Sequence, residues 1–205
     1  MKVLLFGRWL ANPEHAFRAH EVTSVSPFAL ELDPGNHVWA SMQQPCSCWF
    51  ESCPRASEFD LMIAFPPCQF LCASGLHWNM RVPGRQARTD AAVDLVRRLM
   101  ALPIPRIAIE NPVGCISSQI RKPDQIIQPY DFGHDASKRT CLWLKGLPAL
   151  VPTKSVPPRI VNGKPRWANQ FDSGQNNQIN APDRSQARAE RWPGIMEAME
   201  QQWAT

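Results

Sequence analysis

Apolar runs and amphipathic stretches alternate along the chain of 205 residues. The pattern predicts strands at residues 2–6, 21–25, 59–65, 106–110 and 140–144. The runs at 59–65 and 106–110 are almost continuously apolar, which is typical of strands covered on both faces. Apolar residues at helical spacing predict helices at 14–20, 89–102 and 194–203. Strands that alternate with helices in this way predict an α/β fold with a mostly parallel, doubly wound sheet.

Length and composition fit one globular domain. Hydrophobic residues make up 44% and charged residues 20% of the chain, which is ordinary for a folded protein. No apolar run reaches the roughly 18–20 residues that cross a bilayer, and the N-terminal apolar stretch is too short for a secretory signal. We therefore expect a cytoplasmic protein with no membrane partner. It should form a single domain over 1–205, with a polar, proline- and asparagine-rich insertion at 151–180.

The net charge and the cysteines indicate which partners, disulfides and metal sites to expect. The net charge of +4 is compatible with a polyanionic partner, and residues 81–106 carry six arginines against two aspartates. Seven cysteines without a secretory context argue against disulfides. Cys46, Cys48 and Cys53 do not have the spacing of a standard zinc knuckle, so we expect local packing and no metal. The alternative is a zinc site with His37 or Cys72 as the fourth ligand.

Two polar motifs directly follow apolar strands. Pro66 and Pro67 lead into Cys68 after the run at 59–65, and Glu110 ends the run at 106–110. Carboxyl ends of parallel strands meet at one edge of the sheet, where ligands bind. The prolines restrict the backbone before Cys68 and end the ladder of hydrogen bonds there. A thiolate that attacks C6 of a pyrimidine, with an acid near N3, makes C5 nucleophilic, so a thiol and a carboxyl at one edge predict chemistry on a pyrimidine.

Each of these side chains also has a purely structural interpretation. Cys68 could be a buried thiol of the core, and Glu110 could belong to an ion pair. Because Cys68 and Glu110 both follow strands at one edge of the sheet, a catalytic role is favoured over a structural one. The arginines after Cys68 stand in a segment with glycine and proline, where they either contact phosphates or form a solvated surface. Trp78 either packs in the core or stacks on a base.

Four segments carry a resemblance to a known family. FPPCQ (65–69), IENP (109–112), YDFGHDASKRTCLWLKGLP (130–148) and WPGIMEAMEQQW (192–203) resemble motifs of the DNA cytosine-5 methyltransferases, most closely the small phage and prophage members. The resemblance implies a Rossmann-like, S-adenosylmethionine-dependent methyltransferase fold in a protein of a bacterial host cell. It implies that Cys68 is the nucleophile, that Glu110 contacts the cytosine, and that Asn111 holds the loop. Lys138 and Arg139 stand near the arginine positions of a further motif.

The resemblance also implies the ligands. S-adenosylmethionine would supply a methyl group to cytosine in double-stranded DNA, with the target base flipped into the pocket. The segment 70–88 would close over the DNA, and a protein partner or a second copy of the chain could assist. The residues that the resemblance assigns to the cofactor are Phe6, Gly7, Glu31, Asp33, Pro66 and Pro67. Those that it assigns to DNA are Gln69, Ser74, Arg81, Arg85 and Arg88.

The chain departs from the family pattern in four places. The acid expected on the ribose has no clean counterpart, and the motif with Lys138 and Arg139 lacks its expected glutamine. The turn after the first strand has one glycine, Gly7, where the family has a glycine-rich turn. The insertion at 151–180 stands in place of a full target-recognition domain. Two alternatives therefore stay open. One is a catalytically degenerate phage homologue that binds DNA or a protein. The other is a different cytosine modification through the same adduct, either another C5 substitution or deamination.

Overall fold

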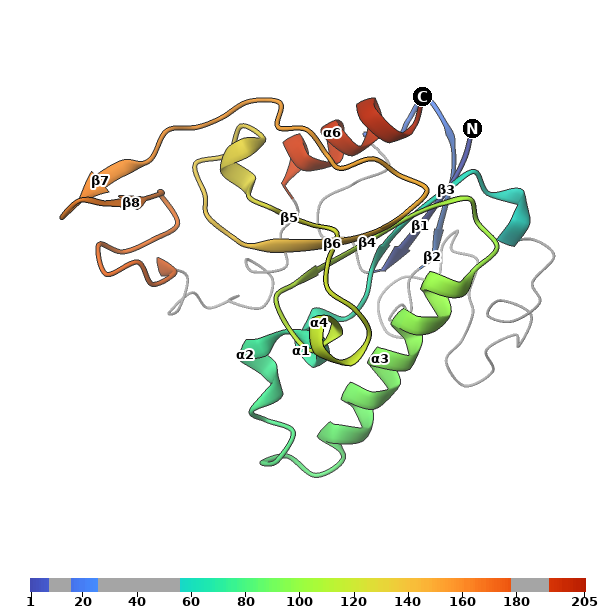
Figure 1. Ribbon diagram of the computed structural model, residues 1–205, viewed down its shortest axis with the longest axis horizontal. Coiled ribbons are helices and arrows are strands. Elements are labelled where there is room, and N and C mark those ends of the chain that lie inside the picture. The colour runs from blue at the N-terminus through green and yellow to red at the C-terminus, as the bar shows by residue number, and fades with distance from the viewer. Residues whose placement is uncertain (8–15, 26–55, 178–191) are drawn as a thin grey trace. The chain divides into compact units, whose positions relative to one another are not determined.

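The computed structural model describes residues 1–7, 16–25, 56–177 and 192–205 (Figure 1). The chain divides into two compact units. The first unit includes residues 17–126 and 140–149 together with the N-terminal strand, and the second includes 127–139 and 150–205. The expectation of a single domain over 1–205 stays a prediction.

A six-stranded sheet organises the first unit. Its strands are β1 (Lys2–Gly7), β2 (Glu21–Val25), β3 (Leu61–Phe65), β4 (Arg106–Pro112), β5 (Gln125–Ile127) and β6 (Thr140–Lys145), in the order β2-β1-β3-β4-β6-β5. The strands β2, β1, β3 and β4 are parallel, and β6 runs antiparallel to β4. The chain adds β2 on one side of β1 and then β3 and β4 on the other, so the strand order reverses between β1 and β3. The expected α/β fold with a mostly parallel, doubly wound sheet is confirmed.

The central strands are buried along nearly their whole length, as their continuous apolar sequences predict. Every residue of β3 is buried, and so are five of the six residues of β1. Helix α3 (Arg85–Ala101) packs on one face of this sheet (Figure 1). Its buried positions Thr89, Ala92, Val93, Val96 and Leu99 recur every three or four residues and form one stripe. The helix thus starts four residues before the predicted 89–102 and covers the predicted face.

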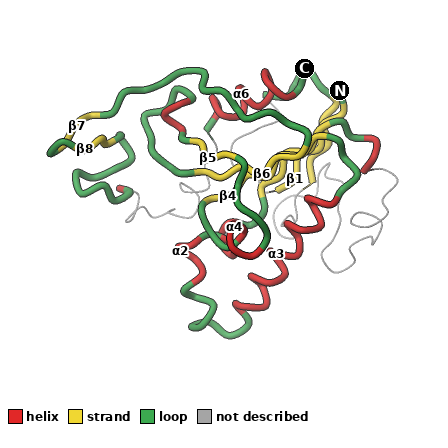
Figure 2. The backbone as a smooth tube through the Cα atoms, viewed as in Figure 1, coloured by secondary structure: helices red, strands yellow, loops and turns green. Residues whose placement is uncertain are grey.

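Short helices fill the connections around the strand ends (Figure 2). A 3-10 turn, η3 (Ala56–Glu58), precedes β3, and two four-residue helices, α1 (Cys68–Leu71) and α2 (Ala73–Leu76), lie between β3 and α3. Another, α4 (Ile116–Gln119), follows β4. The predicted helix at 14–20 is wrong over its described part, where residues 16–19 form a turn. The amide of His20 closes this turn on the carbonyl of Phe17 at 2.9 Å, and β2 begins at the next residue.

The second unit contains a 3-10 turn, η4 (Pro129–Asp131), a hairpin of β7 (Arg159–Val161) and β8 (Lys164–Arg166), and helix α6 (Pro193–Trp203). Asn162 and Gly163 connect the hairpin strands with φ of 50° and 72°, which suits a two-residue hairpin turn. Within this unit Tyr130 stacks on Trp167 with ring centroids 4.1 Å apart. Across both units, none of the described helices combines the length and apolarity that a membrane span requires.

Candidate active site

The sequence after β3 turns at once into a helix that begins with a thiol. Pro66 is buried, and Pro67 takes the N-cap position of α1 with φ of −65°. Cys68 is the first residue of α1 and is half-buried. Because proline has no amide hydrogen, neither Pro66 nor Pro67 can continue the ladder with neighbouring strands. The strand therefore ends where the sequence predicts, and Cys68 lies at the carboxyl edge of the sheet.

Glu110 and Asn111 reach the same edge from the neighbouring strand. Ala64 of β3 pairs with Ile109 of β4, so Glu110 stands one step beyond this pair. Glu110 is 6% exposed and Asn111 is 1% exposed. The Asn111 side-chain amide donates a hydrogen bond of 3.0 Å to the carbonyl oxygen of Pro66. This buried bond connects the end of β4 directly to the segment that carries the thiol.

Buried polar side chains concentrate at this edge. The described chain has four polar or charged residues that are buried: Thr89, Glu110, Asn111 and Thr140. Two of them end β4, and Thr140 is the residue of β6 that pairs with Pro112 beside them. Thr89 bonds through its hydroxyl to the carbonyl of Phe70 in α1, at 3.1 Å. Buried polar side chains are uncommon and need hydrogen-bond partners, so their concentration at one edge makes this edge a candidate for a functional site.

The loop after β4 lies directly against helix α1, a contact that the sequence did not predict. The amide of Cys115 donates to the carbonyl of Leu71 at 2.9 Å, and the amide of Ala73 donates to the carbonyl of Val113 at 3.0 Å. Gly114 lies between them, and a Cβ atom there would stand 1.9 Å from the carbonyl oxygen of Leu71. Sequence reasoning missed Gly114, although a glycine four residues after Glu110 was a visible signal.

The end of β1 lies at the position expected for the cofactor and is packed closely against the end of β3. Gly7 ends β1 with φ of +129° and pairs with Phe65, and a Cβ atom at Gly7 would lie 2.4 Å from the carbonyl oxygen of Phe65. This place is also where the strand order reverses, which is the usual ligand crevice of such sheets. Phe6 is buried beside it. The expected ribose-binding acids, Glu31 and Asp33, lie outside the described residues.

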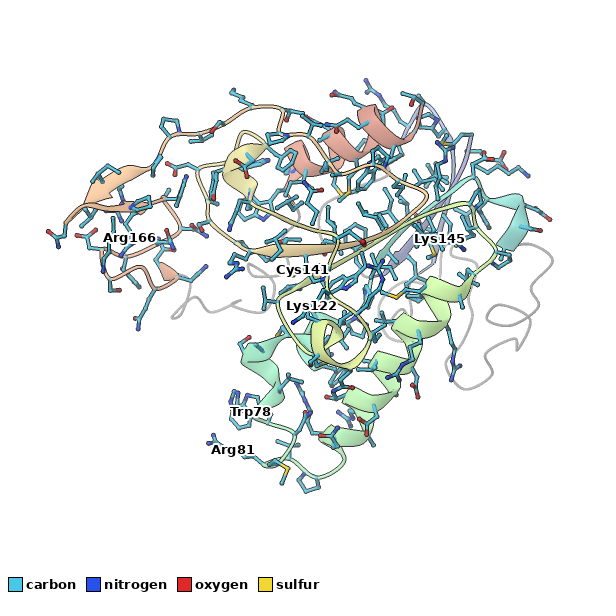
Figure 3. The ribbon with its side chains drawn as sticks, viewed as in Figure 1. Trp78, Arg81, Lys122, Cys141, Lys145 and Arg166 are labelled. Carbon is cyan, nitrogen blue, oxygen red and sulfur yellow. The ribbon has the colours of Figure 1, made fainter. Side chains whose placement is uncertain are left out.

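The residues expected to contact DNA fall into two groups. Gln69, Ser74, Arg81 and Arg88 are exposed. Figure 3 shows Arg81 and Trp78 in the segment between α2 and α3, and the Arg81 guanidinium lies 5.8 Å from the Trp78 ring centroid. Trp78 is 45% exposed, so it is not a core residue. Arg85 differs from these arginines because it is half-buried and its guanidinium contacts the chain itself.

Lys138 and Arg139 belong to the second unit. The backbone amide of Lys138 donates to the side-chain oxygen of Gln128 at 2.9 Å. Asn169 pairs with Ser137 through two hydrogen bonds, one from each residue, of 2.9 and 3.0 Å. These bonds fix the backbone before Lys138 within its own unit. A role of Lys138 and Arg139 in catalysis stays a prediction.

The thiols of the first unit differ in their surroundings. Burial raises the pKa of the Cys115 thiol above its usual value, so Cys115 stays protonated and unreactive at neutral pH. Cys68 and Cys72 are half-buried instead. The cysteines at 46, 48 and 53 lie outside the described residues. In the part of the chain that is described, no three His, Cys, Asp or Glu side chains come together as metal ligands.

Comparisons with known proteins give a distant structural likeness. No family model and no curated protein matches the chain. Among solved structures, the chain resembles a candidate DNA modification methyltransferase encoded within a prophage of E. coli, with 14% identity and a TM-score of 0.43. The match covers 79% of this chain and 53% of that one, so the chain spans about half of the length of that structure. At this distance the likeness does not assign a function.

Proposed function

We propose that the protein is a DNA cytosine-5 methyltransferase in which Cys68 is the nucleophile and Glu110 activates the base. The proposal rests above all on one observation. The Asn111 amide, next to Glu110, is hydrogen-bonded to Pro66, two residues before Cys68. The two motifs are therefore held together at the carboxyl edge, and the surrounding side chains include buried polar ones.

The chain's own residues account for the activation of cytosine. The Cys68 thiolate forms a bond to C6 of the base, and the electron pair of the C5–C6 double bond moves through C4 toward N3. Glu110 donates a proton or a hydrogen bond to N3 and so stabilises the developing charge. The resulting adduct is nucleophilic at C5. After C5 has taken up an electrophile, a base removes the C5 proton and the thiolate leaves C6.

Gly7, Phe6, Pro66 and Pro67 lie at the ends of β1 and β3, where the strand order reverses, which is the usual ligand crevice of such sheets. We propose that these residues hold S-adenosylmethionine, with Glu31 or Asp33 on its ribose. When bound, S-adenosylmethionine supplies the methyl group as an electrophile. The substrate that we propose is double-stranded DNA. The segment 66–89 supports this choice, because it contains three arginines and no acidic residue.

A hydrogen exchange experiment tests the nucleophile without the cofactor. Duplex DNA is incubated with the protein in D₂O, and deuterium at cytosine C5 is measured by mass spectrometry of the nucleosides. Addition of the thiolate to C6 lets C5 take up a deuteron from solvent, and loss of the original proton then leaves the label at C5. We expect uptake with the parent protein and none with Cys68→Ala. Glu110→Gln should slow uptake by about 10²-fold or more, which is typical of a lost general acid.

Uptake that persists in Cys68→Ala would contradict the assignment of the nucleophile. Uptake that is absent even from the parent protein would contradict adduct formation by this chain. The Cys72→Ala variant is a matched control, because Cys72 is a similarly half-buried thiol one helical turn away. It should keep parental uptake.

One feature favours a second candidate, a homologue that binds DNA without transferring a methyl group. Gly7 is followed by Arg8 and Trp9, where the resembled family continues with glycines. Large side chains where the family has glycines are expected to weaken binding of the cofactor and to leave adduct formation intact. Deuterium uptake without measurable binding of S-adenosylmethionine by calorimetry would support this second candidate.

A further inference from the structure

Helix α1 is too short to stabilise itself. It has four residues, and an isolated helix of this length has no favourable free energy in water. In any helix the last four carbonyl groups have no partner within the helix, and α1 has only four residues. Its geometry, and with it the position of Cys68, must therefore come from groups outside the helix.

Each of the four carbonyls of α1 has a different partner. The carbonyl of Cys68 accepts from the amide of Cys72 at 2.8 Å, and that of Leu71 accepts from the amide of Cys115 at 2.9 Å. The two carbonyls between them are held by side chains of one helix, α3. Arg85 donates through Nη2 to the carbonyl of Gln69. The Thr89 hydroxyl shares its one proton between the carbonyl of Phe70 at 3.1 Å and the side-chain oxygen of Asn79 at 3.0 Å.

Arg85 and Thr89 are four residues apart and so lie on the same face of α3. Thr89 is fully buried, and its bond to Phe70 is 3.1 Å long. The Arg85 guanidinium also lies over the Phe70 ring, 4.6 Å from its centroid. The first turn of α3 therefore holds α1 through hydrogen bonds to two consecutive carbonyls and through a cation–π contact.

We infer that Arg85 is a positioning residue that fixes the Cys68 thiol for attack on cytosine, rather than a contact to DNA. The inference rests on the proposed function and deepens it. Arg85 is half-buried, whereas Arg81 and Arg88 on the same segment are exposed. One of its donors, Nη2, is used on Gln69, the residue next to Cys68, and its Nε is buried away from solvent.

The test compares Arg85→Met, Arg85→Lys and the matched control Arg88→Met, all in the full chain. The first readout is the rate at which iodoacetamide alkylates Cys68, followed by peptide mass spectrometry. The second is deuterium uptake at cytosine C5. Loosening of α1 exposes the thiol to a small reagent but misplaces it for the base. Arg85→Met should therefore raise alkylation about threefold and lower deuterium uptake by about 10-fold or more, since a shift of about 1 Å can cost 10²-fold.

Arg85→Lys keeps a cation that can reach the carbonyl, so it should recover a good part of the uptake. Arg88→Met should leave alkylation of Cys68 unchanged. The third readout is the dependence of DNA affinity on salt. Arg88→Met should reduce its slope by about 0.9, as expected for one lost phosphate contact, and Arg85→Met should leave the slope unchanged.

Three outcomes would overturn the inference. One is alkylation in Arg85→Met that equals or falls below that of the parent protein. Another is a reduction of the salt slope by Arg85→Met as large as that of Arg88→Met, which would make Arg85 a phosphate contact. The third is a Cys68 alkylation rate in Arg88→Met that rises as much as in Arg85→Met. The alkylation readout does not require DNA. A protein that never forms the cytosine adduct would therefore refute the proposed function and still leave Arg85 testable.

Discussion

The hydrogen bond between Asn111 and Pro66 should hold the thiol segment against β4, and its removal gives a measurable penalty. In Asn111→Ala the carbonyl of Pro66 loses its donor in a buried position. A buried acceptor without a partner costs about 1–3 kcal/mol, and the vacated volume adds to this. The side-chain oxygen of Asn111, which is buried without a hydrogen-bond partner, is removed as well and offsets part of this cost. We therefore expect a loss of about 2 kcal/mol in the free energy of unfolding. For a chain of this length, that loss corresponds to about 4–8 °C in Tm.

Urea denaturation followed by circular dichroism measures this loss, and thermal denaturation checks it. Asn177→Ala is the matched control, because the Asn177 amide makes a bond of 2.8 Å to the carbonyl of Ala168 at an exposed position. A surface substitution of this kind should change stability by less than about 0.5 kcal/mol. Asn111→Asp should be worse than Asn111→Ala, because a carboxylate oxygen would face the carbonyl oxygen of Pro66. The reasoning is refuted if Asn111→Ala destabilises the protein no more than Asn177→Ala does.

Further predictions concern the cofactor crevice, a buried carboxyl and a buried thiol. Gly7→Ala should destabilise the protein more than Gly84→Ala in urea denaturation. Both glycines have positive φ, but only at Gly7 would a Cβ atom collide with backbone, at 2.4 Å. Burial raises the pKa of Asp131, so its contribution to stability is present at low pH and is lost as pH rises through the raised pKa. Asp131→Asn should therefore be more stable than the parent protein at pH 7 but not at pH 3. The same difference in free energy of unfolding between variant and parent at both pH values would contradict this prediction. Cys115 should resist iodoacetamide at pH 8 in the native protein, because burial raises its pKa. Mass spectrometry should find it modified only after unfolding.

The sheet could be predicted from the sequence because its strands are buried on both faces. Continuous apolar runs placed β1, β3 and β4 within two residues of their observed ends. Periodicity also found α3 and α6, whose buried stripes follow helical spacing. The hairpin of β7 and β8 was missed. Its strands are mostly exposed and have no apolar pattern, although Asn162 and Gly163 were a turn signal.

The candidate site was predictable in part. The two strand ends could be placed at one edge because parallel strands share direction, and proline marked the end of β3. The helix α1 could not be predicted, because its carbonyls depend on partners from distant parts of the sequence such as Thr89 and Cys115. For the same reason, the sequence did not distinguish the half-buried Arg85 from the exposed Arg88. The geometry of α1 and the burial of Arg85 both depend on contacts between residues that are distant in the sequence.

The most direct test of the central claim is nucleoside mass spectrometry of unmethylated duplex DNA incubated with the purified protein and S-adenosylmethionine, in parallel with Cys68→Ser. The account predicts 5-methylcytosine with the parent protein and none with Cys68→Ser. Cytosine that stays unmodified with the parent protein would contradict methyl transfer by this chain. The appearance of 5-methylcytosine with both proteins would contradict the role of Cys68. A different modified base that depends on Cys68 would keep the nucleophile and show that the electrophile is not the methyl group.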